Sequence, residues 1–587
     1  PATGGTFHIN GAAGSTSSTA TGATFAGSGT VTIGGTGNKN WSTNATTNGV
    51  TNVTFTGTLA LRGATIPAVG VAPNNWLAFG GGGGAASANG TTVQTGSFAL
   101  DTGDVSSCGA LILTQGWSGQ YLKLNSLSGT GSIRADWGIS AGTQTRGIEL
   151  DQAGDTVLSG SILVHNGSSQ RRNVSFVKKG AGTLTLTGGL GSSQTVGGNP
   201  ASLNFDIQGG TLQWGDGTTN VTFVNAANWD AASTLVIGGA GTFRIAASGG
   251  FNFNRKITGG TGIFEVTSGD VAASADNSLF AGSTVVAGGS LRLGPSLGSG
   301  TVTVKENAAI SAGLPAANGT SVVATLVLET GTQSTFRLGA TSDKINVTAD
   351  AGLTAPPAGG THTVNLSGKP TAGGTITLID YSGTALSTEE FNRFVLGTVE
   401  GAATFALVNN TDNTSIDVSI TLEDQVWKGT SDGNWDLATG NWELAGTPGV
   451  PTIFDLDHPA RFDDSAYSYA VTVQAGGVSP LVLTIDNSIN DYTFTGGAIA
   501  GTGALLKTGT ATATLAQPSS YTGGTTVNAG KLQIGAGGTT GDIGSGAVVV
   551  AAGSTLEFNR SNATPGTPDL NYKTDAKMRN VSGAGDI

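Results

Sequence analysis

Carboxylates gather most densely in the segment FDLDHPARFDD, whose charged or titratable side chains are Asp455, Asp457, His458, Arg461, Asp463 and Asp464. A carboxylate pair can cleave a glycosidic bond, and several carboxylate oxygens together can bind Ca²⁺. An enzyme that cleaves polysaccharides on stacked strands gathers its carboxylates from several coils, however, and this sequence does not repeat the cluster. We therefore expect a solvated loop here, with no catalytic centre.

A second candidate begins at Asp432 and continues through Asn434 to Asp436, as a calcium-binding loop does. Glu443 stands at the last ligand position of such a loop. Leu437, however, occupies the position where the sharp turn requires glycine. We expect a turn that holds no metal.

The remaining residues that could do chemistry are scattered. His8, His165, His362 and His458 share no spacing with each other or with Cys108, so the sequence supports no zinc site and no Ser-His-Asp arrangement. The tract GGTGNK (34–39) lacks the ending of a phosphate-binding loop. We predict no enzyme, no cofactor and no metal.

Tryptophan offers a different chemistry, because its flat face can stack on a sugar ring. Core packing is the better interpretation for Trp214, which occupies an inward position of the repeat described below. For Trp427, Trp435 and Trp442 we also favour packing over a sugar-binding platform.

The elements that position these residues follow from a repeat. Residues 505–535, LLKTGTATATLAQPSSYTGGTTVNAGKLQIG, alternate at period two, turn at 521–524 and alternate again, which predicts strand, turn and strand. FVKKGAGTLTLTGG and FDIQGGTLQWG form a second copy upstream. STVVAGGSLRLG forms a third half-copy.

The alternation assigns neighbouring residues to opposite faces. Thr183, Thr185, Gln213 and Gln533 are expected to point outward. The expected core positions are Val177, Leu184, Leu186, Leu212, Trp214, Leu291, Leu293, Val527, Leu532 and Ile534.

These segments resemble the autotransporter-associated β-strand repeat of bacterial surface proteins, KTGxGTLTL followed by YTGGTTVNxGTLxLG. The resemblance implies an all-β fold, an elongated right-handed parallel β-solenoid, and a location outside the cell or on the bacterial surface. We expect coils of about 22 residues that climb about 4.8 Å each.

Composition agrees with thin coils more than with compact globules, because 97 residues are glycine and only 11% are charged. The net charge of −12 argues against nucleic acid and anionic membranes as partners. Cys108 is the only cysteine, so no disulfide can form within the chain. No apolar run is long enough for a transmembrane helix.

Three sections can be separated along the chain. Residues 1–320 read as a β-solenoid repeat array, in which the glycine run 79–90 forms an exposed loop. Residues 321–425 read as an irregular β section with one short helix, beginning at the capping box Ser387 to Glu390. Residues 426–587 read as a tryptophan-containing section followed by solenoid repeat.

The chain ends suggest a function. Strand-like alternation starts at Phe7 and Ile9, and the motif VSGAGDI stops at Ile587 in mid-repeat. Truncation of a longer chain would explain this, but we favour head-to-tail association through Phe7, Ile9, Val581 and Ile587.

The leading hypothesis is therefore a structural protein, a subunit of a surface fibre or filament. The alternatives are an adhesin or autotransporter passenger with a glycan or cell-surface partner, and a carbohydrate-active β-helix enzyme.

Overall fold

The computed structural model describes most residues from 121 to 561 and residues 581–586, and before residue 121 it describes only the backbone of nine strands. Gaps in this description after residue 121 lie at 131, 135–141, 168–169, 193–200, 225–232, 315–317, 340, 369, 371, 401–402 and 457.

The described chain folds almost wholly into β-strands, with one short helix, α1 (Thr388–Phe391). This confirms the all-β prediction. The helix begins where the sequence indicated: the Ser387 hydroxyl accepts the Glu390 N–H, and the Glu390 carboxylate accepts the Ser387 N–H. Two of the free N–H groups at the helix start are satisfied in this way.

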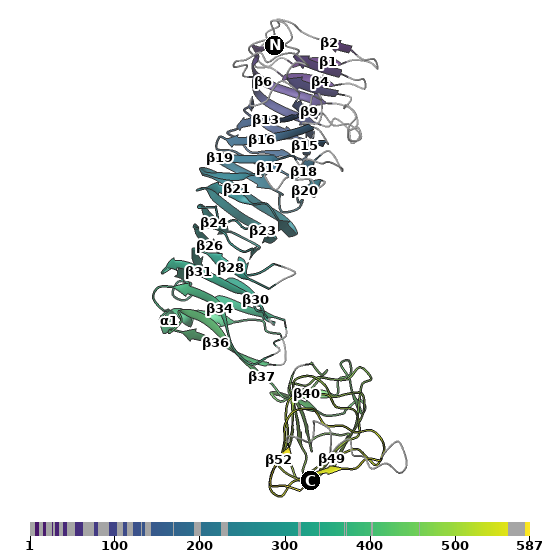
Figure 1. Cartoon of the computed structure of the whole chain (residues 1–587). Coiled ribbons are helices and arrows are strands. Elements are labelled where there is room, and N and C mark those ends of the chain that lie inside the picture. Colours follow the sequence, from purple (N-terminus) through teal and green to yellow (C-terminus); the bar gives the residue numbers. More distant parts are fainter. Residues whose placement is uncertain are drawn as a thin grey trace.

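Parallel pairing dominates a sheet of 32 strands, which Figure 1 shows stacked along one axis. Ile148 pairs with Phe176 and Phe176 with Phe205, so the chain returns to this sheet after 28 and then 29 residues. We call the stretch from one strand to its parallel neighbour in the same sheet a coil. The strands of this sheet used below are β13 (Gly142–Asp151), β14 (Thr156–Leu158), β16 (Gln170–Lys179), β17 (Thr183–Leu186), β19 (Leu203–Trp214), β21 (Leu235–Phe253), β23 (Ile263–Ala273), β25 (Ser290–Leu293), β30 (Thr332–Arg337) and β33 (His362–Ser367).

A five-stranded sheet accompanies the end of this stack. Its order is β28-β31-β34-β37-β36, with parallel pairs first and antiparallel pairs at the β34, β37 and β36 end. The strands are β28 (Thr320–Val323), β31 (Lys344–Asp350), β34 (Gly374–Ser382), β36 (Ala403–Asn410) and β37 (Ser415–Leu422).

From Gln425 onward the chain forms two further sheets, between which it alternates from β42 to β52. One has the order β41-β40-β38-β42-β44-β46-β48-β50-β52, and the other β39-β43-β45-β47-β49-β51. The bounds for the first are β38 (Gln425–Trp427), β40 (Trp442–Leu444), β41 (Thr447–Thr452), β42 (Ala460–Asp463), β44 (Val482–Asp486), β46 (Ala504–Lys507), β48 (Thr525–Val527), β50 (Val548–Val550) and β52 (Val581–Gly583). Those for the second are β39 (Asn434–Trp435), β43 (Ala470–Val473), β45 (Tyr492–Gly496), β47 (Thr512–Leu515), β49 (Lys531–Ile534) and β51 (Thr555–Phe558).

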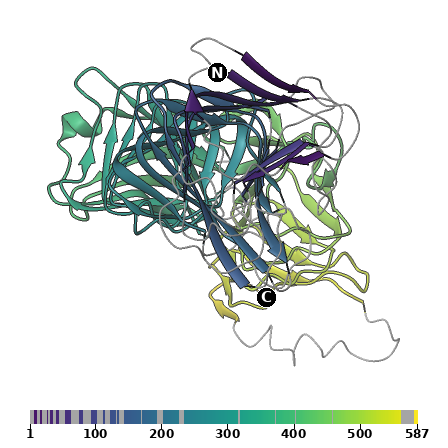
Figure 2. The same cartoon turned by 90° about the horizontal axis from the view of Figure 1, so that it is seen from above.

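Strict alternation of buried and half-exposed residues marks most strands of these stacks, as in β25, β46 and β49. Successive side chains of a strand point to opposite faces, so the apolar residues of every coil meet on one side. The view from above in Figure 2 looks along the stack of the first part of the chain.

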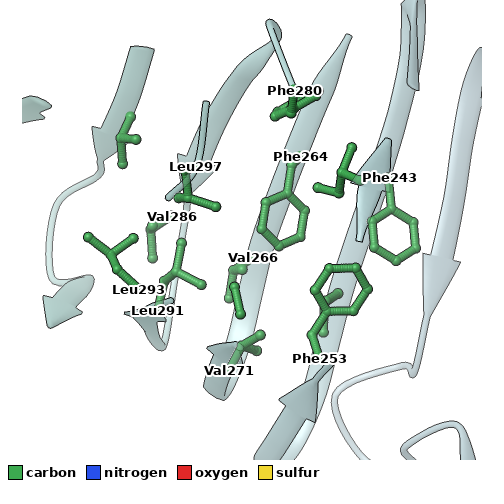
Figure 3. Packing of buried hydrophobic residues seen from close by; sticks show 14 of the residues in the cluster. Phe243, Phe253, Phe264, Val266, Val271, Phe280, Val286, Leu291, Leu293 and Leu297 are labelled. Carbon is green, nitrogen blue, oxygen red and sulfur yellow. The ribbon is translucent and has the colours of Figure 1, made fainter. Parts of the chain in front are cut away.

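Two separate hydrophobic cores result among the residues whose burial the structure describes. The first extends from Leu124 to Ile420 and continues without interruption through residues 321–420. Phe243, Phe253 and Phe264 stack there on adjacent coils, with the Phe243 and Phe264 ring centroids 5.9 Å apart (Figure 3). The second core extends from Trp427 to Leu556. Leu422 and Gln425, the ends of β37 and β38, lie on either side of the junction between them.

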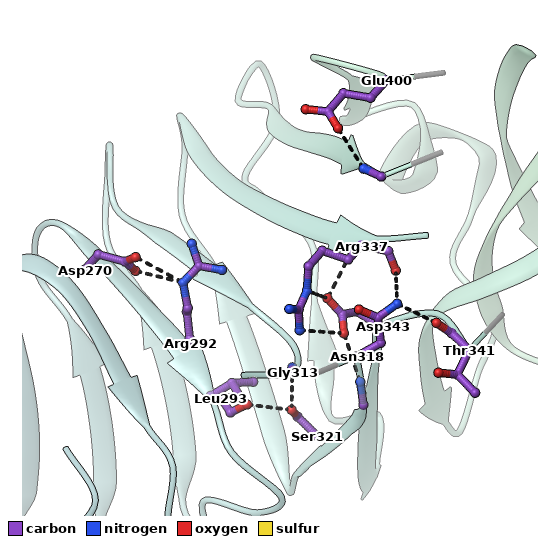
Figure 4. A network of polar contacts seen from close by, with 12 residues as sticks. Asp270, Arg292, Leu293, Gly313, Asn318, Ser321, Arg337, Thr341, Asp343 and Glu400 are labelled. Atoms are coloured by element: carbon purple, nitrogen blue, oxygen red, sulfur yellow. Dashed lines mark hydrogen bonds and ion pairs between the residues drawn. The ribbon is translucent and has the colours of Figure 1, made fainter. Parts of the chain in front are cut away.

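Charged side chains of this part of the chain form ion pairs (Figure 4). Arg292 on β25 contacts Asp270 on β23 at 3.0 Å, and Arg337 contacts the buried carboxylate of Asp343 at 3.0 Å. The Asp343 carboxylate also accepts the backbone N–H of Gly319. No helix in the part of the chain described here has the length and apolar character needed to cross a membrane.

Candidate functional site

The repeat positions expected in the core are buried wherever they fall on described strands. Leu184 and Leu186 on β17 pair with Leu212 and Trp214 on β19. Leu532 on β49 lies between Ala513 and Leu556. The side chains that the structure buries are Val177, Leu184, Leu186, Leu212, Trp214, Leu291, Leu293, Val527, Leu532 and Ile534.

Two of these expectations need a correction in detail. Val177 is buried but lies outside the core cluster, because Val174, Phe176 and Lys178 are the inward residues of β16. Thr185, expected to point outward and be open to solvent, is only 8% exposed. It lies in register between Val157 and Gln213, so side chains on both neighbouring strands flank the threonine.

Two lysines at equivalent places in the repeat point inward, which was not expected. Lys178 lies in register between Leu150 and Ile207. Lys507 lies in register between Ile485 and Val527. Both lysines are completely buried, so each aliphatic stem fills a position that the neighbouring coils fill with an aliphatic side chain.

Each lysine ammonium reaches backbone carbonyls at the corner that follows its strand. Lys178 Nζ donates to the Lys179 and Gly180 oxygens at 2.5 and 3.0 Å, and to Gly209 O at 3.4 Å. Lys507 Nζ donates to the Thr508 and Gly509 oxygens at 2.6 and 2.7 Å, and to Ala529 O at 3.5 Å. We call these two sites the lysine corners.

Burial lowers the pKa of Lys178 and of Lys507 from 10.5 to about 8. Nearby carboxylates oppose this effect by favouring the charged form: Asp151 and Asp155 at the first lysine corner, and Asp486, Asp464 and Asp491 at the second. A lysine with a lowered pKa can act as a nucleophile when a substrate reaches it. Neither ammonium is exposed, so the arrangement performs a structural task in this conformation.

Glycine makes each lysine corner possible. Gly180 and Gly509 have φ values of 68° and 67°, in the left-handed region that glycine tolerates. A Cβ atom at Gly180 would lie 2.3 Å from the Gln152 carbonyl oxygen, and one at Gly509 would lie 2.2 Å from that of Asn487. The backbones of successive coils therefore approach so closely that no other residue fits.

Charged side chains of the acidic segment 455–464 form ion pairs and hydrogen bonds with other groups of the fold. Arg461 bridges Asp486 at 2.7 Å and Asp463 at 3.3 Å. Burial raises the pKa of the Asp464 carboxyl, but backbone N–H groups at 488–490 outweigh burial and lower that pKa below its ordinary value. His458 is buried, and Asp457 lies outside the described residues.

The side-chain amide of Asn441 closes the calcium-like turn. The buried Asn441 side chain donates to Asp432 Oδ1 at 2.6 Å and to Asn434 O at 2.9 Å, and its oxygen accepts the Ser431 N–H at 2.9 Å. Asp436 accepts N–H groups from its own turn. Among the residues that the structure describes, no group of three or more His, Cys, Asp or Glu could hold a metal ion.

The three tryptophans of this section form the start of the second core. Trp427, Trp435 and Trp442 are completely buried, and all three rings contact Phe462 at centroid distances of 5.0 to 5.6 Å. Trp427 Nε1 also donates to Ser468 O at 2.8 Å. Their faces are therefore closed to a sugar ring.

A buried histidine lies in the first core. His362 on β33 contacts the hydroxyls of Thr332 and Ser334 at 2.8 and 2.9 Å, and burial lowers its pKa to about 3. The imidazole stays neutral and has no contact with solvent, which suits a packing role.

The expected junction residues lie on terminal strands. Phe7 and Ile9 belong to β1 (Thr6–Asn10), where they pair with Val31 and Ile33 of β4 (Thr30–Gly34). Val581 begins β52 and pairs with Val548. Ile587 lies outside the described residues, as does most of the glycine run 79–90.

Sequence comparison identifies the segment that contains the second lysine corner. Residues 505–534 match the family model of the passenger-associated-transport-repeat, which confirms for this segment the resemblance to autotransporter passenger repeats. The match covers strands β46 to β49. No curated protein matches the chain.

Proposed function

We propose that this chain is an extracellular passenger-type protein of the bacterial surface, with a structural or adhesive role and no catalytic activity. The observation that carries the proposal is the passenger-associated-transport-repeat match at 505–534. The matched residues span four strands, β46 to β49, which belong to two ladders that continue on both sides, from β42 to β52 and from β43 to β51.

The architecture that fits this role is a right-handed parallel β-solenoid. Parallel strands in one sheet need crossover connections, and such connections are right-handed in nearly all proteins. In the second core the chain visits two sheets in turn, and Ile485, Lys507 and Val527 succeed one another in register. A long thin stack of this kind holds a contact surface away from the cell.

Adhesion gains support from exposed apolar side chains on adjacent coils. Tyr467 is 78% exposed, and Ile489 on the next coil is 82% exposed. Both lie on turns that join the two sheets, after β42 and after β44. Large contiguous apolar patches mark contact surfaces, and loops carry such surfaces on rigid scaffolds.

Surface exposure and binding can be tested separately. Protease treatment of intact cells should remove the chain while cytoplasmic markers survive; a chain that resists protease until lysis would overturn the proposed location. Purified protein should bind host cells or arrayed glycans, and a Tyr467→Ala, Ile489→Ser variant should bind at least about tenfold more weakly. Lys531→Ala, which changes a surface residue elsewhere on the same stack of strands, serves as the matched control.

Head-to-tail self-association is the alternative structural role. Native mass spectrometry and negative-stain images would distinguish it, because filaments require a native mass well above the 57.9 kDa of one chain. Removal of residues 1–10 should then abolish the filaments.

Absence of catalysis is also testable. We expect no turnover on a polysaccharide panel, because Arg461, Asp463 and Asp464 are already bonded to one another or to the next coil. Hydrolysis or elimination that disappears in Asp463→Ala would overturn this part of the proposal.

A further inference from the structure

The two lysine corners share more than a lysine. In each corner, the left-handed glycine two positions after the lysine packs against the preceding coil. A buried side-chain amide of that preceding coil also donates to the first residue of the strand that follows the corner. These hydrogen bonds are Gln152 Nε2 to Thr183 O at 2.7 Å and Asn487 Nδ2 to Thr512 O at 2.9 Å. The same surroundings therefore recur in both cores.

The chemistry of the corners suits one kind of ligand. An ammonium has three N–H donors and no acceptor, and each corner offers three carbonyl oxygens. Two of the carboxylates that act on the lysines bond elsewhere: Asp155 accepts the Thr183 N–H, and Asp491 accepts the Thr512 N–H. Backbone carbonyls, and not a carboxylate partner, hold the charge.

One of the three carbonyls comes from the next coil. It belongs to Gly209 at the first corner and to Ala529 at the second. Each of these residues directly precedes another left-handed glycine, Gly210 or Gly530. The ammonium therefore bonds to its own coil and to the coil that follows.

We propose that each lysine corner is a binding site for a primary ammonium, formed by backbone carbonyls, and that the lysine filling it clamps two successive coils together. The ligand class is a monoalkylammonium ion. Further alkyl groups on the nitrogen would replace N–H donors, and they would be too large for a corner that is closed to solvent. The inference does not depend on what the protein binds at its surface.

Chemical rescue tests the site directly in the full chain. Lys507→Ala removes the stem beyond Cβ together with the ammonium, a volume that n-propylammonium matches. We expect this variant to lower the midpoint of one thermal transition by roughly 5–10 °C. Added n-propylammonium should restore part of that loss in a saturable manner, whereas propyltrimethylammonium, which has no N–H, should not.

Two variants serve as controls. Lys531→Ala removes a half-exposed lysine that pairs with Glu557 at 2.9 Å, and it should shift the midpoint by less than about 2 °C. Lys507→Met keeps the stem without the charge, and it should be destabilised and insensitive to both ions. A Lys507→Met protein as stable as the wild type, or equal rescue by both ions, would overturn the proposal.

A measurement on the unmodified protein covers the case in which Lys507→Ala does not fold. Amine acetylation followed by mass spectrometry should modify Lys178 and Lys507 at least about tenfold more slowly than Lys531, because a hydrogen-bonded, buried ammonium must leave its corner to react. Equal rates at the three lysines would show that the corners are open and would overturn the proposal.

Discussion

At the scale of single residues, the lysine corners carry a pH dependence whose sign can be worked out. Burial lowers the pKa of Lys507 from 10.5 to about 8. Between these two values the unfolded chain holds a proton that the folded chain has released, so stability rises with pH across this window. Below about pH 8 both states are protonated and this dependence vanishes.

We therefore predict that, as the pH rises from 8 to 10, the thermal-unfolding midpoint of the wild-type protein will rise relative to that of the Lys507→Met variant. Titratable groups that both proteins contain affect both midpoints equally, so their contribution cancels in the difference. Tyr521, whose burial raises its pKa to about 12, is one such group. Thermal melts at four pH values check the prediction. A constant difference across the series would mean that Lys507 titrates near its ordinary pKa.

Core positions of the repeat that lack a polar partner should not accept charge. Leu532 is completely buried between Ala513 and Leu556, so Leu532→Asp would place an unpaired carboxylate in the apolar ladder. We expect a loss of at least about 3 kcal/mol in unfolding free energy, measured by urea denaturation. Gln533→Asp changes the neighbouring outward residue and should cost less than about 0.5 kcal/mol. Similar losses in the two variants would contradict the inward assignment of Leu532.

At the scale of elements, the sequence carried enough information for the strands of the repeat and for the helix start. The strand, turn and strand expected at 505–535 form four strands, β46 to β49, because corners at the left-handed Gly509 and Gly530 divide each expected strand in two. The capping box at Ser387 forms as expected. Period-two alternation and a capping box are local patterns, so both can be read without knowing which segments meet in space.

The inward lysines were not predictable in the same way. A lysine within an alternating strand is ordinarily assigned to the outer face, and its core position depends on carbonyls supplied by the next coil. A local signal did exist, because both copies place Lys-x-Gly at the end of the first strand. Its meaning emerges only when the left-handed glycine and the neighbouring coil are seen together.

The turn before the second core depends on Asn441 in the same non-local manner. We predict that Asn441→Ala will cost about 2–4 kcal/mol, because it leaves N–H groups at 431 and 432 and the Asp432 carboxylate without their partner. The exposed Asn434→Ala is the control and should cost much less. The wild-type protein should have the same unfolding midpoint in excess Ca²⁺ as in a chelator. A higher midpoint in Ca²⁺ would indicate that the metal occupies the turn.

At the scale of the whole molecule, the two cores predict two cooperative units. The first core ends at Ile420 and the second begins at Trp427, and only a short segment, including Glu423 and Asp424, connects β37 to β38. Strand β41, at the outer edge of its sheet, contains Pro448 and Pro451, which cannot donate to a further strand. Each core is therefore expected to unfold on its own.

Matched aromatic deletions can assign the transitions. Phe243 contacts Trp214, Phe253 and Phe264 in the first core. Phe462 contacts Trp427, Trp435 and Trp442 in the second. Each replacement by alanine should cost about 3–5 kcal/mol.

We predict that Phe243→Ala will lower one calorimetric transition and Phe462→Ala the other, each without moving its counterpart. The reason is that a cavity destabilises the cooperative unit that contains it, and the two core clusters share no residue. A fragment of residues 425–587 should reproduce the transition that Phe462→Ala affects. If either replacement shifts both transitions equally, the two cores unfold as one unit and the short connection transmits stability between them.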